Sequence, residues 1–281
     1  IANWKPPEVS VAVLRDWNLF LKTVRNFFEK RDFLEVQTPT LVACPGTEPF
    51  LDVFKTEFQR GRRDTRQFYL PTSPELHLKK LVAAGYGPLF EIRPCFRNGE
   101  ISPHHQPEFW MLEWYRPGQN LESIKSDCEA LIRCVAKVFK RAPPKKAKHV
   151  TMQQLFERHF NFELTPRTTA EDLRHLAVRC GVHMAPESDF DDAFYLLFLE
   201  KVEPHLSSSQ QPVFVSGYPP SQAALARITE DGWGDRFELY WREMELANAY
   251  HELNDPKIQR ERSREDLAKK AALARETVNL D

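Results

Sequence analysis

The sequence predicts an α+β fold in which an antiparallel sheet is flanked by helices. Strand-like runs occur in two parts of the chain, residues 90–117 and 212–241, and a helix-rich segment at about 150–208 separates them. These elements follow one another without the regular βαβ alternation that is typical of a parallel sheet. The 281 residues are enough for one sizeable core, so we expect a single domain over residues 1–281.

The first elements are a long helix and a short strand. Apolar residues recur at spacings of three and four through Val11–Glu29, and this spacing predicts an amphipathic helix. The apolar segment Phe33–Val36 follows and is strand-like, and Thr38-Pro39 comes next.

A second helix is expected to begin within Thr72–Glu75. Ser73 suits the N-cap, Pro74 suits the first helical position, and Glu75 complements the helix dipole. Gly85 suits the C-terminal end of this helix. Each of these residues has a structural reason to be there, so this turn alone does not indicate a function.

Helical and strand patterns continue through the rest of the chain. The expected helices are Asp127–Lys140, Thr151–Phe160, Thr169–Cys180, Asp189–Leu206 and Pro256–Glu276. Prolines and lysines between Arg141 and Lys148 predict a loop, and strands are expected at Pro212–Val215 and Arg236–Trp241.

The composition is that of a soluble globular protein. Hydrophobic residues make up 42% and charged residues 28%, and a net charge of −1 gives no support for extended nucleic-acid contacts. The five cysteines are odd in number and lack metal-site or disulfide spacing, which fits a cytosolic protein. No apolar run approaches the roughly 18 residues of a membrane span, and no signal peptide is recognisable. The chain opens on Ile1 rather than Met, so its true N-terminus is left open.

The run Phe90–Pro117 is the most informative stretch for function. Two strand-like segments flank a polar loop that holds Arg97, an acid, His104 and His105. A zinc site would need further His or Cys at ligand spacing, whereas a phosphate contact is natural beside an arginine. The loop therefore predicts an anion site.

The strand Phe109–Arg116 places one set of side chains on a common face. Its alternate positions carry Phe109, Met111, Glu113 and Tyr115. Such a face could stack a planar ring at one end and bind a cation at the other. A half-buried sheet face with an incidental glutamate explains the same spacing, and half-buried strands are common.

A second acidic face is predicted in the run Phe237–Leu253. If Arg242-Glu243 form a two-residue hairpin turn, Tyr240 pairs with Glu245, and Glu238 lies on the same face. Two converging carboxylates would suit Mg²⁺, which prefers oxygen ligands. Two solvent-exposed acids are the alternative interpretation. Glu252 is a third acid nearby.

Three blocks of the chain together resemble the lysine branch of the class II aminoacyl-tRNA synthetases. They are Ser73–Gly85, Phe90–Pro117 and Phe237–Asp255. The segments Thr72–Glu75 (TSPE) and Met111–Pro117 (MLEWYRP) are similar still more closely to the short paralogues that ligate (R)-β-lysine to elongation factor P. The resemblance implies a class II synthetase-like antiparallel sheet. It also implies that the helix Val11–Glu29 is motif 1, with no anticodon-binding domain before it.

The resemblance also implies roles for individual residues. Arg97 would be the catalytic arginine on the ATP α-phosphate, and Phe109 would stack on adenine. The other residues of the ATP site would be Asn98, Gly99, Glu100, His105, Gln106, Glu245 and Leu246. Mg²⁺ would be held by Glu238 and Glu245. The substrate pocket would be lined by Ser73, Pro74, Glu75, Glu113, Tyr115 and Glu252.

Two departures from the family pattern stand out. Gly99 occupies the position of an acid that usually contacts adenine, and Glu100 is a candidate to replace it. Motif 3, a Gly-rich strand and helix with an arginine for the γ-phosphate, would be expected after Asp281. We interpret the chain as truncated there, because a sheet without that strand would expose an unpaired edge and part of the core. A defective paralogue is the alternative.

The function implied is ATP-dependent activation of lysine or (R)-β-lysine as an adenylate, followed by transfer to a lysine side chain of elongation factor P. This interpretation predicts a cytoplasmic homodimer with no membrane contact and no tRNA acceptor. The alternatives are a lysyl-tRNA synthetase catalytic domain, a non-catalytic paralogue, and an asparagine-synthetase-like enzyme. The last of these has no support from Tyr115 and Glu252.

Overall fold

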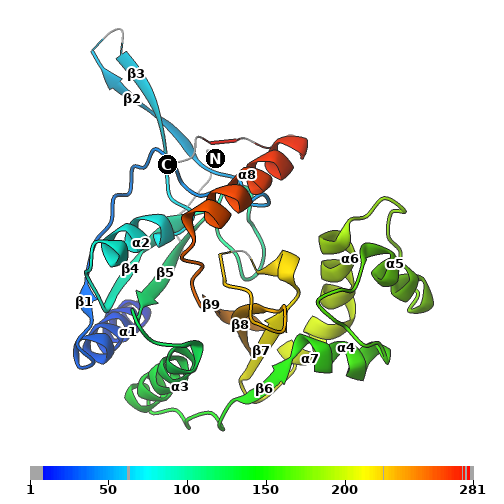
Figure 1. Ribbon diagram of the computed structural model, residues 1–281. Helices are drawn as coiled ribbons and strands as arrows, with labels where there is room; N and C mark the ends of the chain where they lie inside the picture. Colours follow the sequence, from blue (N-terminus) through cyan, green and yellow to red (C-terminus); the bar gives the residue numbers. More distant parts are fainter. Residues whose placement is uncertain (1–8, 62–63, 224, 274, 276, 279–281) are drawn as a thin grey trace.

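The computed structural model describes residues 9–61, 64–223, 225–273, 275, 277 and 278. Figure 1 shows strands in separate groups with helices packed around them, so the predicted α+β class is confirmed. The strands do not form one continuous sheet, as the sequence had led us to expect. They form two sheets and a separate hairpin.

The first sheet contains the predicted run Phe90–Pro117. It has the order β1 (Leu34–Glu35), β4 (Leu89–Phe96) and β5 (Glu108–Tyr115). β4 and β5 are antiparallel, and β1 joins β4 in parallel. The hairpin of β2 (Lys55–Arg60) and β3 (Asp64–Tyr69) projects away from the body of the molecule (Figure 1).

The second sheet contains the predicted acidic hairpin. Its order is β6 (Lys148–Thr151), β7 (Val213–Tyr218), β8 (Gly234–Trp241) and β9 (Met244–Tyr250). β6 joins β7 in parallel, and the other pairs are antiparallel. Within the described part of the chain, β5 and β9 are terminal strands that pair on one side only.

Helix α1 (Val11–Glu29) has the predicted bounds, and the Ser10 hydroxyl accepts a hydrogen bond from the backbone N–H of Val13. Only the C-terminal half of its apolar stripe is buried. Val24 is 1% exposed, whereas Leu14 is 55% exposed. The buried half packs on Phe90 of the first sheet and on other aromatic rings.

Helix α2 (Glu75–Ala83) begins later than predicted. Pro74 rather than Ser73 occupies the cap position, and no side chain caps the helix there. The Ser73 hydroxyl instead accepts a hydrogen bond of 3.4 Å from the backbone N–H of Glu75. Gly85, at φ +89°, follows the end of the helix as predicted, because glycine tolerates this left-handed backbone.

Helix α3 (Leu121–Val138) begins six residues before the predicted Asp127. The Asn120 side chain accepts a hydrogen bond from the backbone N–H of Ser123, and this cap fixes the earlier start. Leu121 and Cys128 of α3 join a core with Phe214 and Phe237 of the second sheet.

The helix-rich segment consists of α4 (Met152–Phe160), α5 (Ala170–Arg179), α6 (Phe190–Leu197) and α7 (Glu203–Ser207). A π-helical turn at Phe198–Val202 interrupts the helix predicted over Asp189–Leu206. Capping boxes at three helix starts fix their positions, at Thr151, Thr169 and Asp189. The core of this segment continues onto one face of the second sheet.

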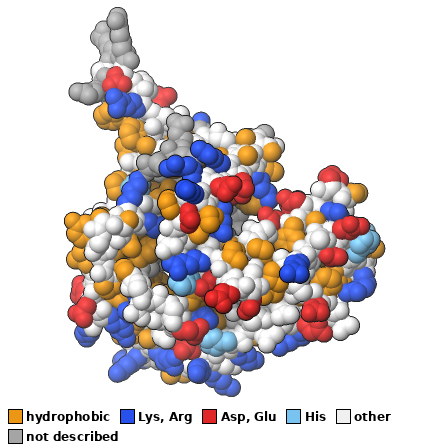
Figure 2. Space-filling view, in the orientation of Figure 1, with side chains coloured by type: hydrophobic (Ala, Val, Ile, Leu, Met, Phe, Trp, Pro, Cys, Tyr) orange, Lys and Arg blue, Asp and Glu red, His pale blue; other side chains and the backbone are white. Residues whose placement is uncertain are grey.

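The last helix, α8 (Pro256–Ala272), ends before the predicted Glu276, which lies outside the described residues. Asp255 caps it through the backbone N–H groups of Lys257 and Ile258. Figure 2 shows acidic and basic side chains close together over this helix, as its sequence predicts. No helix in the described ranges is both long enough and apolar enough to cross a membrane.

Candidate active site

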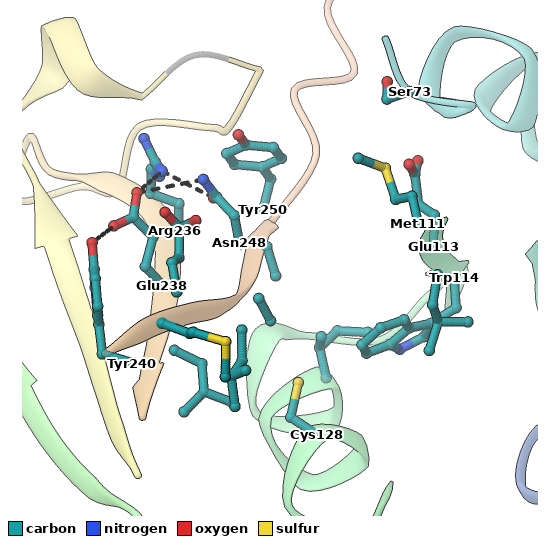
Figure 3. Close-up of a pocket in the computed structure, with 18 of the residues that line it drawn as sticks. Ser73, Met111, Glu113, Trp114, Cys128, Arg236, Glu238, Tyr240, Asn248 and Tyr250 are labelled. Carbon is teal, nitrogen blue, oxygen red and sulfur yellow. Dashed lines mark hydrogen bonds and ion pairs between the residues drawn. The ribbon is translucent and has the colours of Figure 1, made fainter. Parts of the chain in front are cut away.

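A cavity of about 2450 Å³ lies between β5, α2 and the hairpin β8–β9. In Figure 3, Ser73, Met111 and Glu113 line one side of it, and a second polar group lines the other. That group consists of Arg236, Glu238, Asn248 and Tyr250. At the lower end of the view, Trp114 and Cys128 mark an apolar part of the wall. The cavity thus combines a polar part with an apolar wall, as ligand sites commonly do.

The face of β5 is arranged as the alternation predicted. In Figure 3, Met111 and Glu113 point toward Ser73, whereas Trp114 is turned toward α3. Tyr115 donates a hydrogen bond of 2.6 Å to Oε1 of Glu113, which fixes the carboxylate beside the phenol. This face of β5 therefore places the carboxylate of Glu113, fixed by the hydrogen bond from Tyr115, inside the cavity.

Helix α2 adds a carboxylate and a lysine to this region. Nζ of Lys79 lies 2.5 Å from Oε1 of Glu75 and 2.7 Å from Oε2 of Glu252. Burial, together with the charge of Glu75, raises the pKa of Glu113 to about 8. Burial likewise raises the pKa of Glu252 to about 7, although Lys79 acts in the opposite direction. Two carboxylates thus contact one lysine, with Glu113 near enough to interact with all three by charge, and a cationic ligand would favour the ionised forms of these acids.

Arg97 provides the opposite charge in the same cavity. Its Nε is buried and makes no hydrogen bond to any described residue, and its closest carboxylate contact is 3.9 Å, from Nη1 to Oε2 of Glu100. The guanidinium carbon lies 5.1 Å from the centre of the Phe109 ring. A buried donor without a partner suits a phosphate, and the neighbouring ring could stack on a base.

The loop after Arg97 only partly lines the cavity. His104 and His105 line it, together with Arg97 and Phe109. Four other residues predicted for the ATP site are not among the lining residues, namely Asn98, Gly99, Glu100 and Gln106. Gly99 has φ +80°, and a Cβ there would meet nothing within 4 Å. The turn therefore explains a glycine at this position by backbone conformation alone.

The hairpin β8–β9 has the predicted turn and pairing. Arg242 and Glu243 both have positive φ, as a two-residue turn of this kind requires, and Tyr240 pairs with Glu245. Glu245 is exposed to the cavity, and its partly enclosed position and the Glu238 charge raise its pKa. Leu246 follows it in the lining.

Glu238, the other predicted metal ligand, accepts hydrogen bonds at both of its carboxylate oxygens. Its Oε2 accepts hydrogen bonds from the hydroxyls of Tyr218 and Tyr240, both at 2.5 Å. Its Oε1 accepts from Arg236 and from Asn248. Both oxygens are therefore engaged, and Glu245 is the better placed of the two carboxylates for Mg²⁺. No group of three or more metal-ligating side chains occurs in the part of the chain that the structure describes.

The substrate-site predictions are placed as follows. Five of the six residues line the cavity, namely Ser73, Glu75, Glu113, Tyr115 and Glu252. Pro74 is buried and is not among the lining residues. Sequence reasoning missed Lys79 and Asn248. Lys79 lies four residues after Glu75 on the same helix, and Asn248 pairs with Glu238 in the hairpin. Both spacings are visible in the sequence and could have indicated these contacts.

Comparison with known proteins identifies the family. The model of class II tRNA synthetases (D, K and N) matches residues 8–277. The elongation factor P–(R)-β-lysine ligase of Edwardsiella ictaluri is 39% identical over 277 residues, which cover 97% of this chain and 82% of the relative. The protein of the same name from Salmonella paratyphi B is 38% identical over 96% of this chain and 82% of its own. The protein of the same name from Hamiltonella defensa is 35% identical over 100% of this chain and 85% of its own.

These matches confirm the family, the fold class and the ATP-dependent ligase class that the three sequence blocks predicted. They extend over nearly the whole chain, and the strands and helices around the cavity lie within the matched residues. The chain belongs to the class II tRNA synthetase family, in the branch of the elongation factor P–(R)-β-lysine ligases.

Proposed function

We propose that this protein activates (R)-β-lysine or lysine with ATP and transfers the aminoacyl group to a lysine side chain of elongation factor P. The observation that carries this proposal is the pairing of two opposite sites in one cavity. Three carboxylates around Lys79 suit a substrate with two ammonium groups. Arg97, with its unsatisfied Nε beside the Phe109 ring, suits a nucleotide.

The proposed reaction has two steps. The substrate carboxylate attacks the α-phosphorus of ATP, and pyrophosphate leaves. The ε-amine of the acceptor lysine then attacks the carbonyl carbon of the adenylate, loses a proton and forms an amide as AMP leaves. The protein supplies no nucleophile, so its contribution is positioning and charge neutralisation. Arg97 would neutralise the developing charge on the α-phosphate.

The remaining roles follow the same division of the cavity. Phe109 would stack on adenine, and Ser73 and Glu75 would face the substrate amino group. Glu113, Tyr115 and Glu252 would bind the distal ammonium. Mg²⁺, when bound with ATP, would neutralise phosphate charge. We assign it to Glu245, with Glu238 able to join only by giving up one of its present hydrogen bonds.

Mass spectrometry of elongation factor P tests the proposal directly. After incubation with ATP and either lysine isomer, we expect a mass increase of one lysyl group on a single lysine, faster with the preferred isomer. In the full-length protein, a Glu252→Ala variant should lose lysine-dependent ATP–pyrophosphate exchange, whereas Glu243→Ala in the exposed turn should keep it. Unchanged exchange in Glu252→Ala, or charging of tRNA in place of the factor, would contradict the assignment.

We also propose that the protein is a cytoplasmic homodimer. The N-terminal half of α1 exposes apolar side chains that a partner subunit would cover, including Val11, Val13, Leu14 and Trp17. All five cysteines are free, which agrees with a reducing compartment. Sedimentation equilibrium should give twice the monomer mass, and Leu14→Asp should shift it toward the monomer.

A further inference from the structure

Lys79 lies between two carboxylates that come from distant parts of the chain. Glu75 is on the same helix, α2, one turn earlier, whereas Glu252 follows β9 of the second sheet. The two ion-pair distances are 2.5 Å and 2.7 Å, and the side chain of Lys79 is 18% exposed. One ammonium group thus connects the helix beside the first sheet to the end of the second sheet, inside the proposed substrate pocket.

The rest of Glu252 is held through its backbone. Its carbonyl accepts a hydrogen bond of 2.8 Å from Nε of Arg227, and the residue forms an isolated bridge with Ala226. Its Oε2 accepts no hydrogen bond of good geometry from the described residues, although Nζ of Lys79 is close. The carboxylate is therefore oriented by charge attraction between Lys79 and the buried Oε2, while the side chain as a whole is 34% exposed and lines the cavity.

The surrounding charges show why this lysine matters. The groups that face Glu252 are Lys79, Glu75, Glu113 and Tyr115, with Arg227 on its carbonyl. Burial alone would lower the pKa of Lys79, but the two carboxylates outweigh it and raise the pKa. Lys79 therefore stays charged beside Glu113 and Glu252, whose pKa values are raised by burial and lowered by the charge of Lys79.

We propose that Lys79 is a positioning and specificity-determining residue, which holds the carboxylates of Glu75 and Glu252 in place for a substrate with two ammonium groups. This inference rests on the proposed function and deepens it. Without Lys79, the pKa of Glu252 would rise further, and a protonated carboxyl binds an ammonium group poorly. The pocket would then distinguish less between a diammonium and a monoammonium substrate.

The test compares Lys79→Met and Lys79→Arg in ATP–pyrophosphate exchange. The substrates are lysine, (R)-β-lysine and 6-aminohexanoate, which lacks the α-ammonium group. For Lys79→Met we expect the KM for the preferred lysine isomer to rise at least tenfold at pH 7, with a smaller change in kcat. The preference for the lysine isomer over 6-aminohexanoate should fall. The pH at which KM changes most steeply (its pH inflection) should move to a higher value. Lys79→Arg retains the charge and should keep the wild-type inflection.

The outcomes separate this inference from the function on which it rests. If the wild-type protein activates neither lysine isomer, the proposed function fails whatever Lys79 does. If the wild type is active and folded Lys79→Met keeps its KM, preference and pH inflection, the inference is overturned. If Lys79→Met does not fold, Lys79→Arg decides: a wild-type inflection supports the role of the charge, and a displaced inflection contradicts it.

Discussion

Glu238 shows how neighbouring side chains decide what a carboxylate can do. The hairpin pattern correctly placed it on one face with Glu245 and Tyr240. One of its hydrogen-bond donors, Tyr218, comes from β7, 20 residues earlier in the chain. Both residues line the cavity, but both oxygens of Glu238 accept hydrogen bonds inside the protein, whereas Glu245 is exposed there.

Glu252 gives the ligand-free protein a pH-dependent stability. Its pKa in the folded state, about 7, is above the usual glutamate value of 4.5, so folding binds a proton between these pH values. The free energy of unfolding should therefore fall as pH rises from about 4.5 to 7. Allowing for solvent screening, we expect about 1 kcal/mol, or about 2–4 °C in Tm.

Calorimetry of the wild type and Glu252→Gln across this range measures the effect. The Gln variant cannot ionise at this position, so its Tm should decline less between pH 5 and pH 7. Parallel curves for the two proteins would show that Glu252 does not titrate in this range.

A substitution can test whether Gly99 is required for its backbone conformation, independently of the acid that the family usually has at this position. At φ +80° any other side chain adds strain, although a Cβ would have free space around it. Gly99→Ala should therefore lower the free energy of unfolding by about 1 kcal/mol. Denaturant unfolding measures this, and a stability gain would show that the turn tolerates a side chain without strain.

At the scale of elements, features set by neighbouring residues were predicted correctly, whereas the pairing of distant strands was not. The spacing of apolar residues gave the bounds of α1, and the two-residue turn gave the register of β8–β9 near the turn. Helix α3 begins earlier than predicted because the Asn120 side chain caps it. The division of the strands into two sheets depends on pairings between distant segments, which no local period encodes.

The hairpin turn offers an element-scale prediction. Arg242 and Glu243 both adopt positive φ, which residues other than glycine, asparagine and aspartate adopt at a cost. The double change Arg242→Asn with Glu243→Gly keeps the backbone and removes this strain. We expect the free energy of unfolding to rise by roughly 1–2 kcal/mol, seen as a higher Tm in calorimetry. A lower Tm would mean that Arg242, which lies over the Trp241 ring, contributes more than the strain costs.

At the scale of the whole molecule, α8 connects the site to the helix-rich segment. Lys269 lies 3.1 Å from Asp189 and 3.2 Å from Asp191, at the start of α6. On the other side, Lys270 is 1% exposed, and its Nζ donates to the carbonyls of Glu48 and Leu51. The side chains of Glu48 and Leu51 line the cavity, so α8 supports one wall of it.

A matched pair of variants tests this support. Lys270→Met removes a buried charged donor from two carbonyls, so we expect a loss of roughly 1–3 kcal/mol in the free energy of unfolding. Because the freed loop lines the cavity, KM in pyrophosphate exchange should rise as well. Lys269→Met, one residue earlier, breaks only partly exposed ion pairs and should change stability by less than about 1 kcal/mol. Equal effects of the two changes on KM would show that α8 acts on the site through its general packing rather than through the Lys270 contacts with the loop.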